Sequence, residues 1–437
     1  MTESHTQKGA ASGAPGLPGR DLAGRRIVLG LTGGIACYKS CELLRLLVKA
    51  GAEVQVMMSA GAARFITADT LQALSGHPVA GEIWDAREPN GMPHINLTRG
   101  ADAIVLAPAT ADALARLAQG RSEDLISLTC LARPWGSGNA RVPLLVAPAM
   151  NREMWAHPAT QRNLAQVVAD GALVLGVDSG AQACGEVGDG RMIEAEAIVE
   201  ELIAALAPKP LAGRSLLITA GPTFEAIDPV RGITNLSSGK MGFAIARAAR
   251  EAGARVTLVA GPVHLPTPRG VTRIDVQSAA QMYGVVLPVA GRHELFVATA
   301  AVADWRPARL SQHKIKKDGK KVAPSFELAE NADILAAVAA LPAPPYCVGF
   351  AAESEKLLEH ARDKLRRKKL PLIVGNLGPA TFGRDDNALL LVDESTATPL
   401  PADGSAADKL TLARELVAEI ARRLALARPG ASAGAAA

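Results

Sequence analysis

Cysteine, net charge and long apolar runs are all scarce in this chain of 437 residues. Its five cysteines are scattered and odd in number, which argues against a disulfide framework and favours a reducing compartment. A formal net charge of +4 is too small to indicate a nucleic-acid surface. No apolar run approaches the roughly 20 residues of a membrane-spanning helix, so we expect no membrane insertion.

The two ends of the chain are rich in small residues. Residues 1–20 contain Gly, Ala, Ser and Pro but no apolar stretch typical of a signal peptide, so we expect a disordered tail there and another at 429–437. With 49% hydrophobic and 21% charged residues, the composition is that of a soluble globular protein, and the cytoplasm is the expected location. The length predicts two or three domains.

Residues 214–262 have the pattern of a nucleotide-type βαβ unit. Two short apolar runs, Leu216–Thr219 and Val256–Val259, are each closed by Gly-Pro and predict buried parallel strands. Between them Gly242–Ala252 has helical periodicity. Ser237–Gly239 lies just upstream, where free backbone N–H groups and the positive end of a helix dipole favour an anion.

The same plan occurs earlier in the chain. The lead-in LAGR at 22–25 is repeated letter for letter at 211–214, and each copy precedes a strand, a glycine turn, a helix and a second strand. Two such units predict two α/β domains, 21–207 and 208–428. We expect the linker between the two domains at Ala207–Gly213, because this segment carries Pro and Gly.

The first domain alternates strands and helices. Its strands are expected at 27–31, 54–58, 104–107, 144–147 and 173–176. This order predicts a flavodoxin-like or Rossmann-like parallel sheet, whose ligands bind beyond the carboxyl ends of the strands. Three segments fall at those ends: Thr32–Gly34, Pro108–Asp112 and Pro148–Asn151.

The Gly33-Gly34 turn after the first strand suits a phosphate group. The spacing of Gly30, Gly33 and Gly34 does not fit G-x-G-x-x-G, and the second strand ends at Ser59 in place of an acid for a ribose hydroxyl. A mononucleotide such as FMN therefore fits better than NAD. A turn that only packs the helix on the sheet is the alternative.

Histidine and cysteine provide further candidates in the first domain. His94 is expected in a loop before the third strand, and an isolated histidine is more often structural than catalytic. Cys184 lies among three glycines, which favours a mobile flap over core packing. Cys37 and Cys41, four apart at a helix start, have no accompanying metal ligands and are interpreted as core residues.

The second domain lacks a Walker A motif. Thr234 and Met241 stand where G-x-x-x-x-G-K-[ST] requires Gly and Ser or Thr. The basic run Lys314–Lys317 is by itself most simply a solvated segment. Together with Lys364 and Lys368, one helical turn apart on one face, it makes a triphosphate site reasonable.

Motifs spread over the whole chain carry a resemblance to known families. In order they are TGGIA, PATAD, PAMNREMW, DSGAQACGEVGDGRM, AGPTFEAIDPVR, SSGKMGFAIA, AAVADW, KIKK, NADI and VGFAAE. Residues 25–206 resemble the flavin-dependent phosphopantothenoylcysteine decarboxylases, and residues 214–425 resemble phosphopantothenate–cysteine ligase. The chain is thus similar to the bifunctional bacterial flavoproteins of coenzyme A biosynthesis. The resemblance implies two doubly wound α/β domains, a flavodoxin-like flavin domain and a Rossmann-like nucleotide domain.

The resemblance implies roles in the decarboxylase half. The cysteine moiety of the substrate would give a hydride to FMN, and the resulting thioaldehyde would lose carbon dioxide. His94 would act as the base, Asn151 would hold the substrate carboxylate, and Cys184 would donate a proton as the enethiol is reduced. The FMN site would comprise Gly33, Gly34, Ser59 and Thr110.

In the ligase half the resemblance implies a site for CTP and Mg²⁺. The carboxylate of 4′-phosphopantothenate would be activated as an acyl-cytidylate, which the amine of cysteine attacks. Asn235 would hold the acyl-cytidylate, and Lys314 matches a lysine needed for catalysis. The nucleotide contacts would be Ala298, Thr299, Ala300, Asp304, Lys314, Asn331, Ala332, Asp333, Ile334, Phe350, Lys364 and Lys368. The metal ligands are not identified.

Three departures from the family pattern leave details open. Phe224 stands where the family usually has Arg, Asp112 where many decarboxylases have Asn, and 131–143 is longer than usual. The resemblance also implies a homo-oligomer, with flavin sites between the protomers of a trimer and ligase domains paired as dimers. Two alternatives remain: a flavoprotein decarboxylase whose second domain only binds nucleotide, and a flavin-binding regulatory scaffold.

Overall fold

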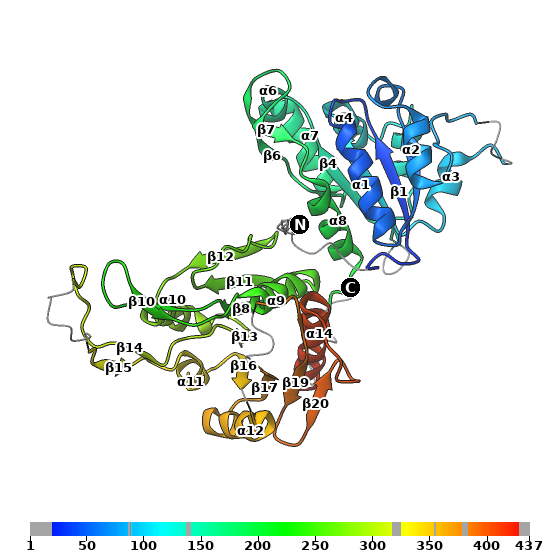
Figure 1. Cartoon of the computed structure of the whole chain (residues 1–437). Helices are drawn as coiled ribbons and strands as arrows, with labels where there is room; N and C mark the ends of the chain where they lie inside the picture. Colours follow the sequence, from blue (N-terminus) through cyan, green and yellow to red (C-terminus); the bar gives the residue numbers. More distant parts are fainter. Residues whose placement is uncertain are drawn as a thin grey trace, which may run out of the picture. The chain divides into compact units, whose positions relative to one another are not determined.

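The computed structural model describes residues 20–85, 88, 90–136, 141–316, 325–353, 355–377 and 383–427. They form two compact units, which divide between Leu206 and Ala207. Figure 1 shows that each unit is a sheet flanked by helices. Among the helices of these ranges, none has both the length and the hydrophobicity needed to cross a membrane.

The first unit is built on a parallel sheet with the strand order β2-β1-β3-β4-β5. This is the flavodoxin order, in which the order of adding strands reverses between β1 and β3 and ligands bind at that switch point. The last strand is two residues shorter than the sequence predicts. The strands are β1 (Arg26–Leu31), β2 (Glu53–Met58), β3 (Ala103–Ala109), β4 (Leu144–Pro148) and β5 (Leu173–Val174).

Helices cover both faces of this sheet. Successive residues of a strand point to opposite faces, so Leu29 packs with Leu44 of α1 and Ile198 of α8, whereas Val28 packs with Ile126 of α5. Both faces of β1 and β3 are therefore buried, as their continuous apolar sequences require. The helices are α1 (Cys37–Lys49), η1 (Ala62–Arg64), α2 (Ala68–Ser75), α3 (Pro93–Thr98), α4 (Ala111–Gln119), α5 (Leu125–Ala132), α6 (Arg152–Ala156), α7 (Pro158–Ala169) and α8 (Ala195–Leu206).

Two segments that the sequence predicts as irregular are ordered elements. His94 lies in helix α3 and not in a loop; the helix begins at Pro93, because proline suits the first helical position. The glycine-rich segment around Cys184 is an antiparallel hairpin of β6 (Asp178–Ala181) and β7 (Val187–Arg191). Cys184 sits in the connection between these two strands.

The second unit contains an eight-stranded sheet with the order β12-β11-β8-β13-β16-β17-β19-β20. Its first six strands are parallel and follow the Rossmann order, with the switch point between β8 and β13. β16 runs past Phe350 to Glu353, where it still pairs with β17. The strands are β8 (Ser215–Ala220), β11 (Arg255–Ala260), β12 (Val271–Asp275), β13 (Leu295–Ala298), β16 (Tyr346–Glu353), β17 (Leu372–Leu377), β19 (Leu389–Val392) and β20 (Ala397–Leu400).

Two helix layers and three short strand pairs complete the second unit. Leu216 of β8 packs with Phe243 of α9, while its neighbour Leu217 packs on the other face with Val286 of α10. The helices are α9 (Lys240–Glu251), α10 (Ala279–Ala290), α11 (Ile334–Ala339), α12 (Leu357–Lys368) and α14 (Lys409–Ala427). The pairs are β9 (Phe224–Ala226) with β10 (Gly232–Thr234), β14 (Trp305–Pro307) with β15 (Leu328–Glu330), and β18 (Asp386–Asn387) with β21 (Ala407–Asp408).

Candidate functional site

The carboxyl ends of β1 and β3 meet at the switch point of the first sheet. Thr32 follows β1 and its hydroxyl donates to the Pro108 carbonyl at 2.8 Å. The same Thr32 oxygen accepts from the Thr110 backbone N–H at 2.9 Å. Thr110 in turn caps α4, accepting from the Ala113 N–H at 3.2 Å. The two loops are thus fixed to each other beside the amino-terminal end of α4.

A close approach of two glycines shapes the same region. A Cβ on Gly33 would lie 2.8 Å from the Cα and carbonyl carbon of Gly61, so the turn after β1 touches the loop after β2 backbone to backbone. A Cβ on Gly34 would meet only the Thr110 methyl group at 3.9 Å. Gly33 is therefore required by packing, and Gly61 is a site residue that no sequence motif indicates.

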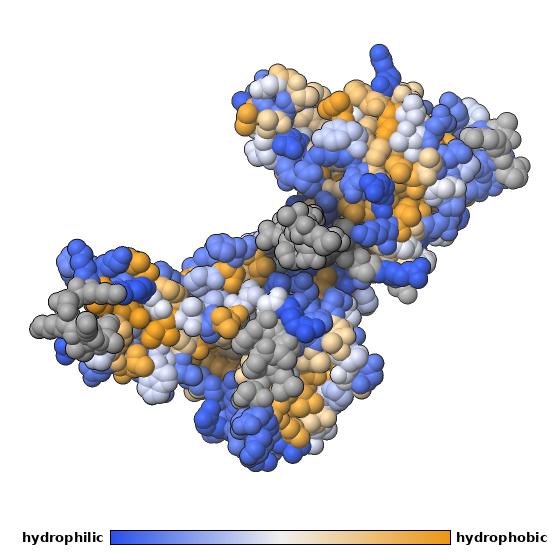
Figure 2. Space-filling model, in the orientation of Figure 1, coloured by the Kyte–Doolittle hydropathy of each residue, from blue (hydrophilic) through white to orange (hydrophobic). Residues whose placement is uncertain are grey.

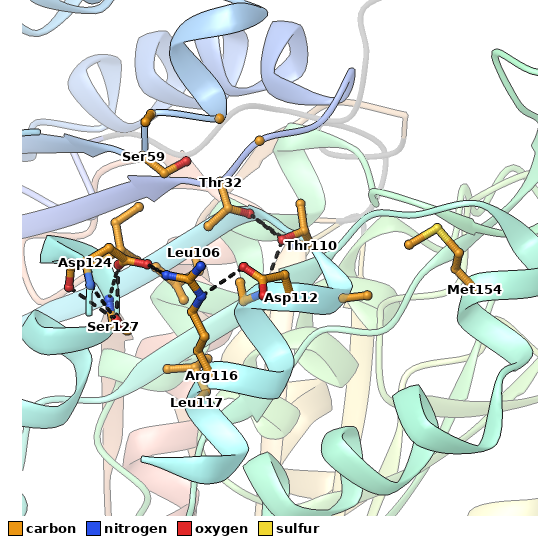
Figure 3. Close-up of a pocket in the computed structure, with 16 residues that line it drawn as sticks. Thr32, Ser59, Leu106, Thr110, Asp112, Arg116, Leu117, Asp124, Ser127 and Met154 are labelled. Carbon is orange, nitrogen blue, oxygen red and sulfur yellow. Dashed lines mark hydrogen bonds and ion pairs between the residues drawn. The ribbon is translucent and has the colours of Figure 1, made fainter. Parts of the chain in front are cut away.

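A cavity of about 480 Å³ opens between these loops (Figure 3). Three of the four residues expected to bind the cofactor, Gly33, Ser59 and Thr110, line it. The cavity has the size of a small-molecule site, and its glycines and hydroxyls suit a phosphorylated ligand. The other lining residues are Thr32, Ala60, Gly61, Leu106, Ala111, Asp112, Ala113, Arg116, Leu117, Asp124, Ile126, Ser127 and Met154.

Asn151 and Cys184, 33 positions apart, are in contact. Asn151 follows β4 and caps α6, accepting from the Glu153 N–H at 2.8 Å, while its amide nitrogen lies 3.5 Å from the Cys184 sulfur. The β6–β7 hairpin makes this contact possible, because Gly190 of β7 accepts a hydrogen bond from the Met150 N–H at 2.9 Å. A Cβ on Gly190 would clash with the Met150 carbonyl oxygen, which explains the glycine.

Two further polar side chains complete this cluster, and sequence reasoning did not single them out. Gln182 accepts from the Asn151 amide at 3.2 Å and from the Arg152 N–H at 3.0 Å. Glu186 accepts from the Cys184 thiol at 3.5 Å and also from the Asn151 amide. Their place in the DSGAQACGEVGDGRM motif was the available signal. The thiol is exposed, so a substrate can reach it.

His94 lies apart from that cluster. It is half-buried in α3, which packs against α5, and its Nδ1 is buried without a hydrogen-bond partner among the described residues. It does not line the cavity. The structure of one chain therefore brings Asn151 and Cys184 together but links His94 to neither of them by any hydrogen bond of the described residues.

In the second unit, Asn235 is fixed at the switch point. It follows β10, and its amide donates to the carbonyl of Ala301 just beyond β13. Ala301 also donates to the Gly221 carbonyl after β8, at 2.9 Å, and accepts from the Thr223 N–H at 3.2 Å. Asn235 thus bridges the two strand ends between which the Rossmann fold binds its ligand.

The segment that carries Lys314 is tied to an ion pair between the buried carboxylate of Asp228 and the exposed guanidinium of Arg231. Asp228 is only 1% exposed, and the Arg231 guanidinium, with backbone N–H donors, holds the pKa of its carboxyl well below the usual range. Asp228 also accepts from the Ile315 N–H at 3.1 Å, and Arg231 donates to the Ile315 carbonyl at 2.8 Å. The Lys314 side chain is exposed, and Lys317 lies outside the described residues.

Phe224, one of the departures from the family pattern, packs across the β9–β10 hairpin. A Cβ on Gly232 would lie 2.3 Å from the Phe224 ring, so the ring and the glycine are complementary. Phe224 is paired with Thr234, the residue before Asn235. An aromatic ring therefore supports the hairpin from which Asn235 projects.

The expected nucleotide residues gather at the ends of β13 and β16. Asn331, 9% exposed, donates to the Ala303 carbonyl at 2.8 Å, and its N–H donates to the Asp304 carbonyl at 2.8 Å. Ala298 is paired with Gly349, next to Phe350. Thr299 and Ala300 continue from β13, and both bond to Thr219 of β8. Ala332, Asp333 and Ile334 lead into α11.

Lys364 and Lys368 project from one face of α12 towards these strand ends. Lys364 Nζ donates to the Phe350 carbonyl at 2.6 Å, and Lys368 Nζ lies 2.6 Å from the Asp333 carboxylate. Burial favours the neutral acid, yet the Lys368 hydrogen bond and the Ala336 N–H outweigh it and lower the pKa of Asp333. The carboxylate that caps α11 is thus ionised and paired with a lysine.

Cysteine and acidic residues do not assemble a metal site in the described ranges, where His, Cys, Asp and Glu form no group of three suited to an ion. Cys37 is buried in the core cluster and Cys41 packs against it, as the sequence predicts. Burial raises the pKa of the Cys37 thiol, which keeps it protonated. An ion carried by a nucleotide triphosphate needs only one or two protein carboxylates.

Family models match both halves of the chain. Residues 16–207 match "Flavoprotein" and residues 211–424 match "DNA/pantothenate metabolism flavoprotein C-terminal domain". The chain is similar to the coenzyme A biosynthesis bifunctional protein CoaBC of Vibrio cholerae, with 48% identity over 87% of this chain and 95% of the relative. The protein of the same name from Escherichia coli K12 is 47% identical over 87% and 94%, and that from Bacillus subtilis 42% over 92% and 97%.

Solved structures resemble the two halves separately. The C-terminal domain of a CoaBC protein is 36% identical and covers 49% of this chain and 98% of its own, with a TM-score of 0.40. A PPC decarboxylase mutant complexed with pantothenoylaminoethenethiol is 29% identical and covers 41% and 96%, with a TM-score of 0.36. The assignment rests on the sequence relatives, which extend over nearly the whole chain. The chain belongs to the family of coenzyme A biosynthesis bifunctional proteins.

Proposed function

We propose that this bifunctional enzyme of coenzyme A biosynthesis performs two consecutive reactions. The second unit joins cysteine to 4′-phosphopantothenate with CTP, through an acyl-cytidylate. The first unit then decarboxylates 4′-phosphopantothenoylcysteine to 4′-phosphopantetheine. The observation that carries the proposal is the contact between Asn151 and Cys184, which unites an amide and an exposed thiol at one polar cluster of a flavoprotein unit.

FMN is the proposed cofactor of the first unit. The residues fit a flavin mononucleotide: the Gly33–Gly61 approach leaves backbone facing the cavity, Ser59 and Thr110 supply hydroxyls, and Leu106 adds an apolar wall. Gly34 lies next to this lining. Bound flavin supplies a two-electron acceptor and donor, so the overall reaction needs no external redox partner.

The residues of the Asn151–Cys184 cluster have complementary tasks in decarboxylation. The substrate's cysteine moiety loses two electrons and two protons, and carbon dioxide then leaves. Two electrons and three protons return, so that net redox change is zero and one proton is taken up for the carbon dioxide released. Asn151 donates an uncharged hydrogen bond to the carboxylate, which holds it without opposing its departure. Cys184 gives one of the returning protons, with Glu186 accepting a hydrogen bond from its thiol. His94 is the proposed base of the first step.

CTP with Mg²⁺ is the proposed nucleotide of the second unit. Lys364 and Lys368 supply positive charge at the ends of β13 and β16, and the exposed Lys314 adds another. These cations and the metal ion stabilise the pyrophosphate that leaves when the acyl-cytidylate forms. Asn235, fixed between β8 and β13, holds that intermediate.

We further propose a cytoplasmic homo-oligomer. All five cysteines are free, which suits a reducing compartment. The first unit exposes Trp84, 86% accessible, and Met92, 48% accessible, on either side of the segment that leads to His94. Figure 2 shows further apolar side chains among polar ones on the visible face of each unit. A second copy covering such residues would also surround His94.

Product analysis tests the proposed function directly. The enzyme receives CTP, 4′-phosphopantothenate and cysteine, and we expect pyrophosphate, carbon dioxide and 4′-phosphopantetheine in equal amounts. Carbon dioxide from supplied 4′-phosphopantothenoylcysteine, without CTP-dependent ligation, would leave the second unit as a nucleotide-binding domain only. A chain that binds flavin but forms neither product would be a regulatory scaffold.

A further inference from the structure

A charged cluster lines the flavin cavity at the side away from the glycine turns, and we call Asp112, Arg116 and Asp124 the Arg116 cluster. Arg116 Nε lies 2.9 Å from the Asp112 carboxylate, and Arg116 Nη1 binds the Asp124 carboxylate. All three residues line the cavity. Figure 3 shows the guanidinium between the two carboxylates, within the cavity that Thr32 and Thr110 also border.

Asp124 caps helix α5 without any contribution from Arg116. Asp124 caps α5 through its Oδ1 atom, which accepts from the Ser127 N–H at 2.8 Å and from the Ser127 hydroxyl at 3.1 Å. Arg116 binds the other oxygen, Oδ2. The capping box is therefore complete without the guanidinium, and Arg116 Nη2 has no protein partner among the described residues.

The surroundings of the cluster strengthen its electrostatic effect on a ligand. The Arg116 side chain is 26% exposed and the Asp124 side chain 33%, whereas that of Asp112 is 68% exposed, and the apolar residues Leu106, Leu117 and Ile126 line the same cavity. Charges in such a partly apolar site are screened less than charges in water. The cluster has two negative groups and one positive group, so its net charge is −1, and each single substitution changes that charge in a known direction.

We propose that the Arg116 cluster sets the reduction potential of the bound flavin, with Arg116 favouring the reduced form and the two carboxylates opposing it. Reduction adds negative charge to a flavin, and a neighbouring cation stabilises that charge whereas a neighbouring anion destabilises it. Arg116 is in this sense a positioning and tuning residue of the decarboxylase. The inference rests on the proposed function, because it requires flavin in this cavity.

Two substitutions with opposite expected signs test the inference. In the full-length protein loaded with FMN, Arg116→Gln removes the cation and Asp112→Asn removes one anion, and both preserve approximate side-chain size. The measurement is the reduction potential of bound FMN by equilibration with a reference dye, together with the dissociation constants of oxidised and reduced FMN. Arg116→Lys is the matched control, because it keeps the charge.

We expect Arg116→Gln to weaken reduced FMN about tenfold more than oxidised FMN, which lowers the two-electron potential by about 30 mV. Asp112→Asn is expected to shift the potential upward by a smaller amount, because the Asp112 side chain is 68% exposed and its charge is screened more, and Arg116→Lys to stay near the unmodified protein. A role confined to holding α4 against α5 would change flavin affinity equally for both redox states.

The outcomes separate this inference from the proposed function. Bound FMN with an unchanged potential in Asp112→Asn, or shifts of the same sign in both variants, overturns the inference and leaves the flavin site intact. Should Arg116→Gln fail to fold, the upward shift of Asp112→Asn still decides the question. An unmodified protein that binds no FMN would overturn the proposed function itself.

Discussion

The two units share an α/β plan but build their sites from different parts of the chain. In the first unit, glycine backbones and hydroxyls after β1, β2 and β3 form the cavity. In the second, charged side chains from α12 and polar side chains from strand ends surround the switch point. The LAGR sequence that precedes the first strand of each unit does not predict this difference.

The difference between the two units shows how one architecture can form sites for two different ligands. Parallel sheets always offer a crevice at the switch point, and the residues just past the strands decide what binds there. A site made of backbone contact should fail when bulk is added. A site made of side-chain charge should fail when charge is removed.

The largest effect on activity is expected from substituting the predicted catalytic residues of one unit at a time. Cys184→Ser and His94→Asn should each lower carbon dioxide release about 100- to 10,000-fold, because they remove a proton donor or acceptor, while pyrophosphate release is unchanged. Lys314→Gln should lower pyrophosphate release and leave carbon dioxide release from supplied 4′-phosphopantothenoylcysteine unchanged. Pyrophosphate is measured with CTP, 4′-phosphopantothenate and cysteine, carbon dioxide is measured with supplied 4′-phosphopantothenoylcysteine, and Cys41→Ser, a core cysteine, is the control. If either decarboxylase variant also stops ligation, the two sites are not independent.

A larger side chain at Gly33 should weaken FMN binding in the first unit and leave the site of the second unit unchanged. In Gly33→Ala the new methyl group would clash with the backbone of Gly61, so the loops must separate. Overpacking of about 1–3 kcal/mol predicts FMN binding weakened about 10- to 100-fold, measured by flavin fluorescence titration. Gly284→Ala, where a Cβ meets nothing within 4 Å, is the control. Unchanged FMN binding in Gly33→Ala would contradict the close approach as a requirement.

Sequence periodicity predicts most of the two sheets but not their local details. The apolar runs of β1, β3 and β8 are found because buried parallel strands are continuously apolar. Helix α3 is missed because Gly91 and Pro93 favour a loop, although proline also suits the start of a helix. The continuation of β16 depends on pairing with β17, which no local pattern contains.

Some site residues are likewise predicted from the sequence, and others are not. Gly33 and Thr110 fall in predicted strand-end segments, Ser59 is implied by the family resemblance, and all three line one cavity. Gly61 is missed because backbone contact between two loops leaves no motif. The approach of Cys184 to Asn151 depends on a hairpin that begins at Asp178, 27 positions after Asn151, so only the family resemblance suggests it. Their catalytic roles stay predictions.

Charge removed from α12 should weaken the second site alone. Lys364→Met and Lys368→Met are each expected to raise the KM for CTP about tenfold, because each removes a charge-assisted contact to phosphate. Initial rates of pyrophosphate release at varied CTP provide the measurement, with Arg367→Met, exposed on the same helix, as control. Carbon dioxide release from supplied 4′-phosphopantothenoylcysteine should not change. An unaltered KM in both lysine variants would exclude this face of α12 from the nucleotide site.

The smallest effect is a pH dependence confined to the second unit. The folded pKa of Asp333 is lowered, so its ionisation contributes stability above the unfolded pKa and loses it as pH falls through the folded value. Lys368→Met removes the partner at 2.6 Å, and because Asp333 is 47% exposed we expect a loss of only about 1 kcal/mol at neutral pH. That loss should diminish as the pH falls through the lowered folded pKa of Asp333, where the carboxyl becomes protonated.

Backbone hydrogen exchange in α11 measures the local effect of the Asp333–Lys368 pair. Ala336, in the first turn, donates its N–H to Asp333 at 2.9 Å, so loss of the lysine should increase exchange there more than in α9 or α14. We expect the difference between Lys368→Met and the unmodified protein to shrink from pH 7 to pH 3 after correction for intrinsic exchange rates. A difference that grew towards acid pH would mean that Asp333 is stabilised as the neutral acid. In the first unit, whose site depends on backbone contact between Gly33 and Gly61, the same substitution should leave exchange unchanged at every pH.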